Sequence, residues 1–250
     1  MGPERVYGLH TVRALLTRAP QRVRKLWLQQ GRDDQRVAQI EALASASQRP
    51  IERVAGARLR GWLGEVAHQG VMAEIEALPP LREDDFYTRL ADAPDSLILA
   101  LDGVQDPHNL GACLRTADAC GVLAVVVPRD RAAPLNATAR KVAAGAAETT
   151  PVVTVTNLSR SLRLIKETGH WIIGADAGAT TPAREVDMTG GRCLVLGAEG
   201  TGLRALTRRN CDWLVRLPAL GAVESLNVSV AAGMLLYEAI RQRQATGTAR

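Results

Sequence analysis

Six short, continuous apolar runs constrain the fold more than any other feature of this sequence. They lie at 97–101, 124–127, 152–155, 171–173, 193–196 and 214–217. Runs that do not alternate between polar and apolar residues are typical of strands buried on both faces of a parallel sheet. Helical patterns lie between them at 109–120, 136–148, 158–168 and 202–210, and another follows at 226–243. The sequence therefore predicts an α/β domain over 96–250, with a parallel sheet and helices on both of its faces.

Residues 1–78 have a different organisation and predict a small separate α/β domain. Helices are expected at 10–18, from Asp33 onward and at 57–63, and strands at 23–28, 50–54 and 71–78. Residues 79–95 contain three prolines and five acidic residues against two arginines. That composition predicts a linker or an exposed short helix between the two domains.

Composition excludes several classes of protein. No apolar run approaches the roughly 18 residues that a membrane span requires, and the N-terminus lacks the plan of a signal peptide. We therefore expect a cytoplasmic protein without a membrane partner. Cys113, Cys120, Cys193 and Cys211 form no C-x-x-C pair and have no His at zinc-ligand spacing. We expect them to be small core residues, with neither a disulfide nor a metal site.

The charge of the chain is +5, and only Lys25, Lys141 and Lys166 among its 31 basic residues are lysines. Guanidinium groups match phosphate oxygens and stack on bases, so the arginine bias suits a nucleic-acid partner. A GC-rich genome would produce the same bias through its codons, and composition does not separate these two explanations.

Three stretches place polar residues directly after a predicted buried strand. In the first, Asn109 has the residue type of a helix N-cap, and Gly111 would let another backbone or a ligand come close. Arg115 is six positions from Asn109, which is not a same-face helical spacing. If both serve one site, Asn109 acts from the loop and Arg115 from the helix; the alternative is a cap and a solvent-exposed arginine.

The second stretch, 196–202, has three glycines in six residues, at 197, 200 and 202. It resembles a dinucleotide-binding turn only loosely, because it follows the fifth predicted strand rather than the first. No acidic residue follows at the distance that a nicotinamide cofactor requires, so that cofactor is disfavoured. Glu199 is expected either to cap the next helix or to act as a functional carboxylate.

The third stretch runs from Leu217 across a loop with Glu224, Ser225 and Asn227 into a helix of small and apolar residues. That composition predicts a buried helix with polar groups at its start. His108 is the only histidine near the three stretches, and a lone histidine is more often structural or on the surface. The combined residues include no metal ligands and no nucleophile–His–Asp arrangement. They favour transfer of a group from a bound small molecule, aided by positioning and one base.

Three segments carry a specific resemblance: 109–117 (NLGACLRTA), 196–202 (LGAEGTG) and 217–231 (LPALGAVESLNVSVA). In order and spacing they resemble the three motifs of the SpoU/TrmH class of RNA ribose methyltransferases, over 96–243. Within that class the chain is most similar to the enzymes that methylate a guanosine 2′-hydroxyl in 23S ribosomal RNA. Residues 102–109 (DGVQDPHN) and 135–148 (LNATARKVAAGAAE) carry this closer similarity.

The resemblance implies a site for S-adenosylmethionine within a deep trefoil knot, and a homodimer packed through the knot region. It implies that Asn109, Arg115, Ser225 and Asn227 face the target ribose. It also implies that the main chain holds the cofactor, with Glu199 close by; the implied cofactor positions are Leu196, Gly197, Gly202, Leu217 and Leu226. Residues 7–12 (YGLHTV) and 68–73 (HQGVMA) resemble a ribosomal-protein-like RNA-binding domain, which implies RNA binding for the N-terminal domain.

The sequence leaves three alternatives to methylation of a guanosine in 23S ribosomal RNA. The first is the same chemistry on another ribosomal or transfer RNA nucleotide, although the extra N-terminal domain argues against the minimal tRNA type. The second is a non-catalytic RNA-binding assembly factor, against which the intact motif residues argue. The third is a nicotinamide-dependent enzyme, which the position of the glycine-rich turn disfavours.

Overall fold

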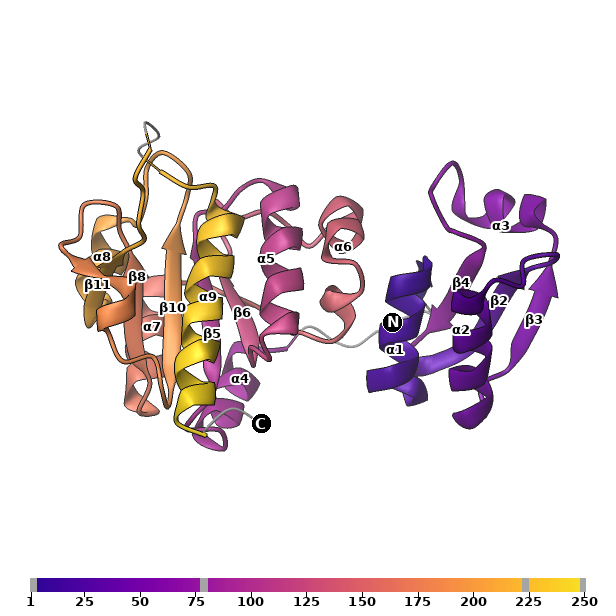
Figure 1. Ribbon diagram of the computed structural model, residues 1–250, viewed down its shortest axis with the longest axis horizontal. Helices are drawn as coiled ribbons and strands as arrows, with labels where there is room; N and C mark the ends of the chain where they lie inside the picture. Colours follow the sequence, from indigo (N-terminus) through magenta and orange to yellow (C-terminus); the bar gives the residue numbers. More distant parts are fainter. Residues whose placement is uncertain (1–3, 77–80, 222–224, 248–250) are drawn as a thin grey trace. The chain divides into compact units, whose positions relative to one another are not determined.

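The structure is a computed structural model that describes residues 4–76, 81–221 and 225–247 (Figure 1). The chain forms two compact units. The first consists of residues 1–79 together with 144–149, and the second of residues 80–143 and 150–250. None of the helices in the described ranges combines the length and apolar character that a membrane span requires.

The first unit is built on a four-stranded sheet with strand order β1-β4-β2-β3. Strand β4 is antiparallel to β1 and β2, whereas β2 and β3 are parallel. The elements are β1 (Glu4–Tyr7), α1 (Leu9–Arg18), η1 (Pro20–Arg22), β2 (Val23–Gln29), α2 (Gln35–Ala46), β3 (Ile51–Val54), α3 (Gly56–Leu63) and β4 (Val71–Ile75). The sequence predicted these elements except β1 and η1.

Two apolar clusters hold the first unit together. Helices α1 and α2 cover one face of the sheet with residues such as Leu15 and Ile40. Helix α2 starts at Asp34, whose carboxylate accepts hydrogen bonds from the main-chain N–H groups of residues 36 and 37. A smaller cluster of Trp27, Leu59 and neighbouring residues lies beneath α3.

One helix expected from the sequence is interrupted. The pattern at 136–148 predicted a continuous helix, but α6 (Ala137–Ala143) ends before Ala144 and Gly145, whose φ angles are 52° and 99°. These left-handed conformations stop the helix. A short 3₁₀ turn, η2 (Ala146–Glu148), follows and belongs to the first unit. There the carboxylate of Glu148 pairs with Arg22 at 3.2 Å, and both side chains are buried.

The second unit contains a seven-stranded sheet with strand order β7-β6-β5-β10-β8-β11-β9, and every pair in it is parallel. Its strands are β5 (Leu97–Asp102), β6 (Ala124–Pro128), β7 (Val152–Val155), β8 (Trp171–Ala175), β9 (Thr181–Pro182), β10 (Arg192–Gly197) and β11 (Trp213–Arg216). The six predicted strands are confirmed, and the two-residue β9 was not predicted. All residues of β5 and β6 are buried, as their continuous apolar runs indicated.

Helices cover both faces of this sheet. Figure 1 shows α5 (Pro107–Ala119) beside α9 (Val228–Ala245), and α9 packs against β10. The other face is covered by α4 (Glu83–Ala91) and α7 (Leu158–Glu167), whose apolar side chains join the main core. The two remaining elements of this unit are η3 (Ala183–Glu185) and α8 (Ala205–Asn210).

Residues 83–91, which the sequence placed in a linker or an exposed short helix, form the packed helix α4. Phe86 and Leu90 of this helix are completely buried in the core of the second unit. Its first turn carries three acidic residues, which interact favourably with the positive end of the helix dipole. The acidic residues therefore lie in the first turn of a helix. Phe86 and Leu90 pack that helix against the sheet.

The four cysteines contribute small side chains to the second unit. Cys113 and Cys193 are completely buried, and Cys120 and Cys211 are partly buried. Burial raises the pKa of the Cys113 and Cys211 thiols to about 12, so these thiols are protonated at neutral pH.

Candidate functional site

The topology of the second unit brings the three polar stretches together at the carboxyl edge of the sheet. Strands β5 and β10 are parallel neighbours, so Asp102 lies opposite Gly197 at their carboxyl ends. Helix α9 begins after the third stretch and packs against both α5 and β10. Ligands of open parallel sheets bind at this edge.

A hydrogen-bonded network joins one residue from each stretch. The Asn227 side-chain amide donates to Glu199 Oε1 at 2.6 Å and to Asn109 Oδ1 at 3.0 Å. The Asn109 amide donates to the same Glu199 oxygen at 3.1 Å. The main-chain N–H of Val228 approaches that oxygen at 3.4 Å. Glu199 therefore acts as the common acceptor that orients both amides, rather than as the cap of α8.

Asn227 and Asn109 hold different positions on their helices. Asn227 is the N-cap of α9, because its Oδ1 accepts from the main-chain N–H of Ser229 at 2.9 Å and of Val230 at 3.4 Å. The expectation that Asn109 caps its helix was wrong: Asp106 is the N-cap of α5, and Pro107 is its first residue. Asn109 therefore acts from the first turn of α5 and not from the loop. The main-chain N–H of His108 holds the pKa of Asp106 below its usual range.

The glycine-rich turn after β10 folds back onto its own strand. A Cβ atom on Gly197 would lie 2.0 Å from the carbonyl carbon of Gly202, so only glycine fits there. Gly200 and Gly202 have φ angles of 77° and 64°, in the left-handed region. A Cβ atom on either would meet open space. The main chain of this turn is therefore accessible to a ligand, with exposed Glu199 at its tip.

Arg115 and Gly111 lie on α5, the helix that also carries Asn109, but neither residue belongs to the network. Arg115 is exposed, and in the described part of the chain its side chain makes no hydrogen bond or ion pair. Its guanidinium is thus available to a substrate. A Cβ atom on Gly111 would lie 2.5 Å from the carbonyl oxygen of Ala139, so this glycine lets α6 pack closely against α5. Its role is packing and not ligand contact.

The remaining predicted residues lie at the same edge but outside the network. Ser225 is exposed, Leu217 and Leu226 are partly buried, and Leu196 is 1% exposed in the sheet core. Glu224 lies outside the described residues. The helix after this stretch is less buried than its composition indicated, because Val230, Met234 and Tyr237 are exposed.

An ion pair at this edge was not predicted from the sequence. Asp102 ends β5 with its side chain fully buried, and it contacts Arg204 just before α8. A carboxylate at the end of a continuous apolar run was the available signal for Asp102. No local pattern connects it with Arg204, which is 102 positions away.

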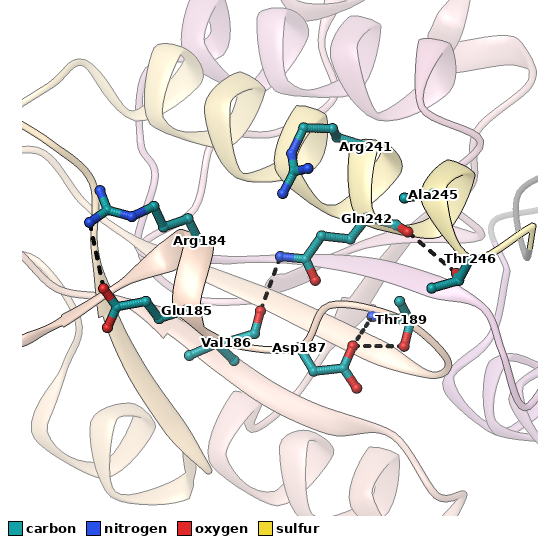
Figure 2. A pocket seen from close by; sticks show the side chains of 9 residues that line it. All are labelled: Arg184, Glu185, Val186, Asp187, Thr189, Arg241, Gln242, Ala245 and Thr246. Carbon is teal, nitrogen blue, oxygen red and sulfur yellow. Dashed lines mark hydrogen bonds and ion pairs between the residues drawn. The ribbon is translucent and has the colours of Figure 1, made fainter.

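A cavity of about 600 Å³ lies at the opposite edge of the unit, between the C-terminal part of α9 and the segment that leads into β10 (Figure 2). It is lined by Arg184, Asp187, Arg241, Gln242 and neighbouring residues. Because β10 starts at Arg192, this cavity lies at the amino edge of the sheet. It is not part of the network that joins the three stretches.

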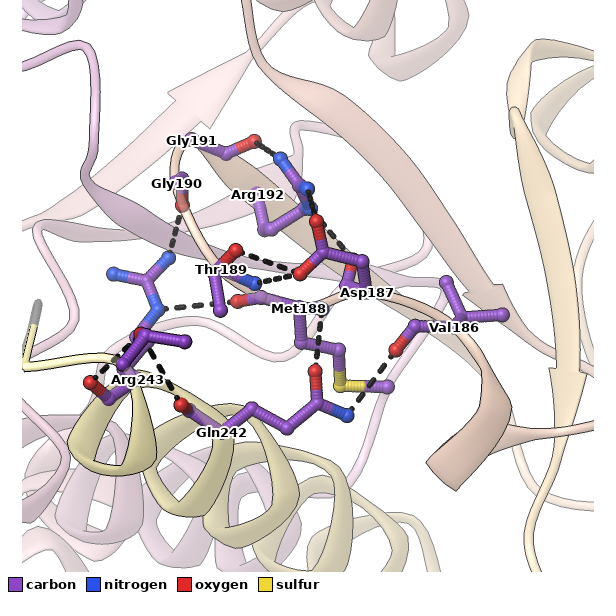
Figure 3. Close-up of polar contacts among 10 residues, drawn as sticks. Val186, Asp187, Met188, Thr189, Gly190, Gly191, Arg192, Gln242 and Arg243 are labelled. Atoms are coloured by element: carbon purple, nitrogen blue, oxygen red, sulfur yellow. Dashed lines mark hydrogen bonds and ion pairs between the residues drawn. The ribbon is translucent and has the colours of Figure 1, made fainter.

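Figure 3 shows how two side chains near the end of α9, those of Gln242 and Arg243, contact the loop before β10; Gln242 also lines the cavity. The side-chain amide of Gln242 accepts from the Met188 N–H at 2.8 Å and donates to the Val186 carbonyl at 3.2 Å. It thus satisfies the same main-chain groups that a neighbouring β-strand would pair with. Arg243 donates to the carbonyls of Met188, Gly190 and Asp95. These contacts fasten the end of α9 to the loop before β10.

The described residues contain no group of three His, Cys, Asp or Glu side chains that could hold a metal ion. The chemistry available at the carboxyl edge includes the exposed carboxylate of Glu199, the amides of Asn109 and Asn227, the exposed guanidinium of Arg115, the hydroxyl of Ser225 and an accessible main-chain turn.

Two family models match the two parts of the chain. The SpoU rRNA Methylase family matches residues 96–237, which include the whole network. A second model, described as RNA 2′-O ribose methyltransferase substrate binding, matches residues 5–81.

Full-length relatives carry the same two parts. The chain is 50% identical over 243 residues to the 23S rRNA (guanosine-2′-O-)-methyltransferase RlmB of Pseudomonas aeruginosa, covering 96% of this chain and 97% of the relative. It is 47% identical over 244 residues to RlmB of Escherichia coli, covering 96% and 99%.

Solved structures share the fold. The SpoU methyltransferase AviRb of Streptomyces viridochromogenes, in complex with the cofactor AdoMet, superposes with a TM-score of 0.76 at 24% identity, covering 98% of this chain and 92% of that one. The TrmH/SpoU tRNA modifying enzyme of A. aeolicus has a TM-score of 0.57 at 31% identity, covering 66% and 86%. With the matching model over more than half of its length and these relatives along almost all of it, the chain belongs to the SpoU rRNA methylase family.

Proposed function

We propose that this protein transfers the methyl group of S-adenosylmethionine to the 2′-hydroxyl of a guanosine in 23S ribosomal RNA. The observation that carries the proposal is the contact of Asn109, Glu199 and Asn227 at the carboxyl edge of the sheet. Each comes from a different motif of an RNA methylase family. Full-length relatives of about half identical sequence are named for this reaction on 23S rRNA.

The test uses the purified protein, methyl-labelled S-adenosylmethionine and total RNA from a strain that lacks the protein. Label is expected in 23S rRNA, at the ribose of one guanosine when the product is mapped. Arg115→Lys serves as the inactive control. Label at a base would contradict the 2′-hydroxyl as acceptor. Label in transfer RNA or in 16S rRNA would instead support the alternative substrate.

The residues at the site fit S-adenosylmethionine. The open main chain at Gly200 and Gly202 offers hydrogen-bonding groups without side-chain obstruction. The main chain of Leu196 and Gly197, the partly buried Leu217 and Leu226, and Gly202 would hold the cofactor. When bound, S-adenosylmethionine supplies an electrophilic methyl group.

The ribose is addressed from two helices. Asn227 and Asn109 hold their amides in fixed orientations through Glu199, and this preorganisation reduces the cost of aligning the hydroxyl for in-line attack. Ser225 adds an exposed hydroxyl next to Leu226. Arg115 supplies an exposed guanidinium from α5 for the substrate phosphate.

A ribose hydroxyl is a weak nucleophile unless its proton leaves during attack. A guanidinium normally keeps its own proton in proteins, which makes it a poor base. Arg115 therefore stabilises the developing alkoxide, and Glu199 or water accepts the proton. A Glu199→Gln variant tests the carboxylate as the acceptor. A changed pH profile identifies Glu199 as the acceptor, and an unchanged profile leaves water or, in the alternative, Arg115 itself as the base.

The N-terminal domain, residues 1–78, binds RNA next to the target nucleotide in this proposal. Its charge of +4 and the family model over residues 5–81 support this role. Two guanidinium groups lie near the ring of Trp62, those of Arg58 at 4.8 Å and Arg5 at 5.7 Å from its ring centre. Aromatic rings and arginines of this kind stack on splayed bases.

This role is tested with Arg5→Gln and Arg58→Gln, and with Arg13→Gln and Arg36→Gln on α1 and α2, which lie on the other side of the sheet, as controls. We expect the first pair to weaken RNA binding and to reduce its dependence on salt. The affinity for S-adenosylmethionine should not change. Equal effects of both pairs on RNA affinity would contradict a specific surface around Trp62.

The proposal includes the deep trefoil knot, the homodimer and a cytoplasmic location. The knot is supported by the return of the chain from the end of β11 at Arg216, two strands beyond β10, to the start of α9 at Val228, which packs on β10 and α5. The dimer is supported by the exposed Val230, Met234 and Tyr237, which recur along one side of α9. Tyr237→Glu should shift the protein toward a monomer in light-scattering measurements.

A further inference from the structure

Asp102 is a buried carboxylate that the proposed reaction does not use. Its side chain is fully buried at the carboxyl end of β5, next to the glycine-rich turn after β10. A buried carboxylate is stable only when it is paired and hydrogen-bonded. The hydrogen-bond partners of Asp102 therefore indicate which segment this carboxylate positions.

Both oxygens of Asp102 contact a single residue, Arg204. Oδ2 accepts from the Arg204 main-chain N–H at 2.9 Å, and Oδ1 pairs with the Arg204 guanidinium. The main chain and the side chain of one arginine are thus fixed by one carboxylate. A lysine lacks the planar fork that makes this geometry possible.

The pair lies where it can control the position of Glu199. Asp102 is the register partner of Gly197, and Arg204 is the N-cap residue of α8. The turn that carries Glu199 lies between Gly197 and Arg204. The Gly202 main-chain N–H closes it internally by donating to the Ala198 carbonyl at 2.9 Å, and Asp102 holds its far end at Arg204. The Glu199 carboxylate is itself exposed, and no core packing holds it.

We propose that Asp102 and Arg204 form a positioning pair that fixes the turn at 198–203, so that Glu199 meets the amides of Asn109 and Asn227. The proposal rests on the proposed function for its kinetic consequence, but the ordering of the turn does not depend on it. Because the pair acts on the turn and not on the substrate in this proposal, its loss is expected to lower turnover and to leave the KM for RNA nearly unchanged.

The experiment compares Arg204→Gln with Arg208→Gln. Arg208 is on the same helix, α8, is similarly exposed, and pairs with Asp176 at 2.8 Å. Arg204→Gln should accelerate amide hydrogen exchange across 198–204 and lower kcat by about 10-fold or more, since small misplacements of catalytic groups have effects of this size. Arg208→Gln should change neither. Arg204→Lys should recover only part of the loss.

Removal of Arg204 alone leaves an unpaired buried carboxylate, which destabilises the fold. The double variant Asp102→Asn/Arg204→Gln removes that charge and should recover stability without recovering kcat. If either variant keeps the parental kcat while only its stability falls, the pair is structural and the proposal is wrong. Unchanged exchange at 198–204 in Arg204→Gln also overturns it. If the parent enzyme methylates no RNA, the proposed function fails, and the exchange comparison still decides on the turn.

Discussion

The two ends of helix α9 are held in opposite ways. At its N-terminus, Asn227 contacts the side chains of Glu199 and Asn109, and all three lie at or near the surface. At its C-terminus, Gln242 and the buried Arg243 contact main-chain groups of the loop before β10. The helix has 18 residues, so about 27 Å separates its two ends.

This difference assigns different roles to the two ends of α9: one end contributes to the proposed reaction and the other to the stability of the fold. Exposed side chains that are hydrogen-bonded to one another remain accessible to a ligand, whereas a buried arginine bonded to carbonyls cannot leave without depriving those carbonyls of their donors. The C-terminal end therefore anchors the helix, and the N-terminal end presents its polar groups to a substrate.

The largest expected effect is on turnover, from a change at the carboxyl edge. Arg115→Lys should lower kcat by about 100-fold or more, because an ammonium group does not reproduce the fork that holds a phosphate and a developing alkoxide. The midpoint of denaturant unfolding should not change, since Arg115 is exposed. Near-normal methyl transfer by this variant would contradict both roles considered for Arg115.

The next effect is on stability, from a change at the amino edge. Arg243→Met should lower the free energy of unfolding by about 3 kcal/mol, because it leaves buried carbonyl groups without donors. Turnover per folded molecule should stay within a few-fold of the parent. The measurement is urea unfolding together with active-site titration. If Arg243→Met had normal stability and low activity, the C-terminal end of α9 would serve turnover rather than stability, which would contradict the assigned roles.

The sheet could be predicted from the sequence because its strands are buried on both faces and are therefore continuously apolar. The site could be predicted in part, because Asn109, Glu199 and Asn227 each follow such a run. The start of α5 was misjudged although the signal was present, since Asp106 followed by Pro107 is a strong helix start.

Other features had a weak signal or none in the local sequence. Gly145 indicates a helix end, but the break begins one residue earlier at Ala144, whose positive φ is rare for alanine and is determined by the surrounding structure. The pairing of Asp102 with Arg204 depends on the neighbouring positions of β5 and β10. The exposure of one side of α9 was missed because apolar composition does not distinguish a buried helix face from an exposed one.

A matched pair of amides tests the two ends with one type of substitution. Asn227→Ala and Gln242→Ala should each lower the free energy of unfolding by about 1 kcal/mol, the first by removing a helix cap and the second by removing hydrogen bonds to main-chain groups. Only Asn227→Ala should also lower kcat. Equal losses of kcat in both variants would show that the amino edge participates in turnover.

The smallest expected effect is the pH dependence of stability at the amino edge. His170 is 2% exposed and lies between Ser96 and Thr168, with each ring nitrogen 2.9 Å from a hydroxyl oxygen. Burial lowers the pKa of His170 below its usual value of 6.5, and the positive charges of Arg192 and Arg243 act in the same direction. The native imidazole therefore stays neutral at a pH where the imidazole of the unfolded chain takes a proton.

Because the unfolded state binds more protons in that window, stability should fall as the pH decreases below 6.5. His170→Gln keeps hydrogen-bonding groups at this position but cannot titrate. The difference in unfolding midpoint between the parent and this variant should therefore change between pH 7 and pH 5, in favour of the variant at the lower pH. A difference that does not depend on pH would mean that His170 takes up a proton equally in both states. The buried contacts at this end of α9 would then tolerate a charge as readily as the exposed network at the other end.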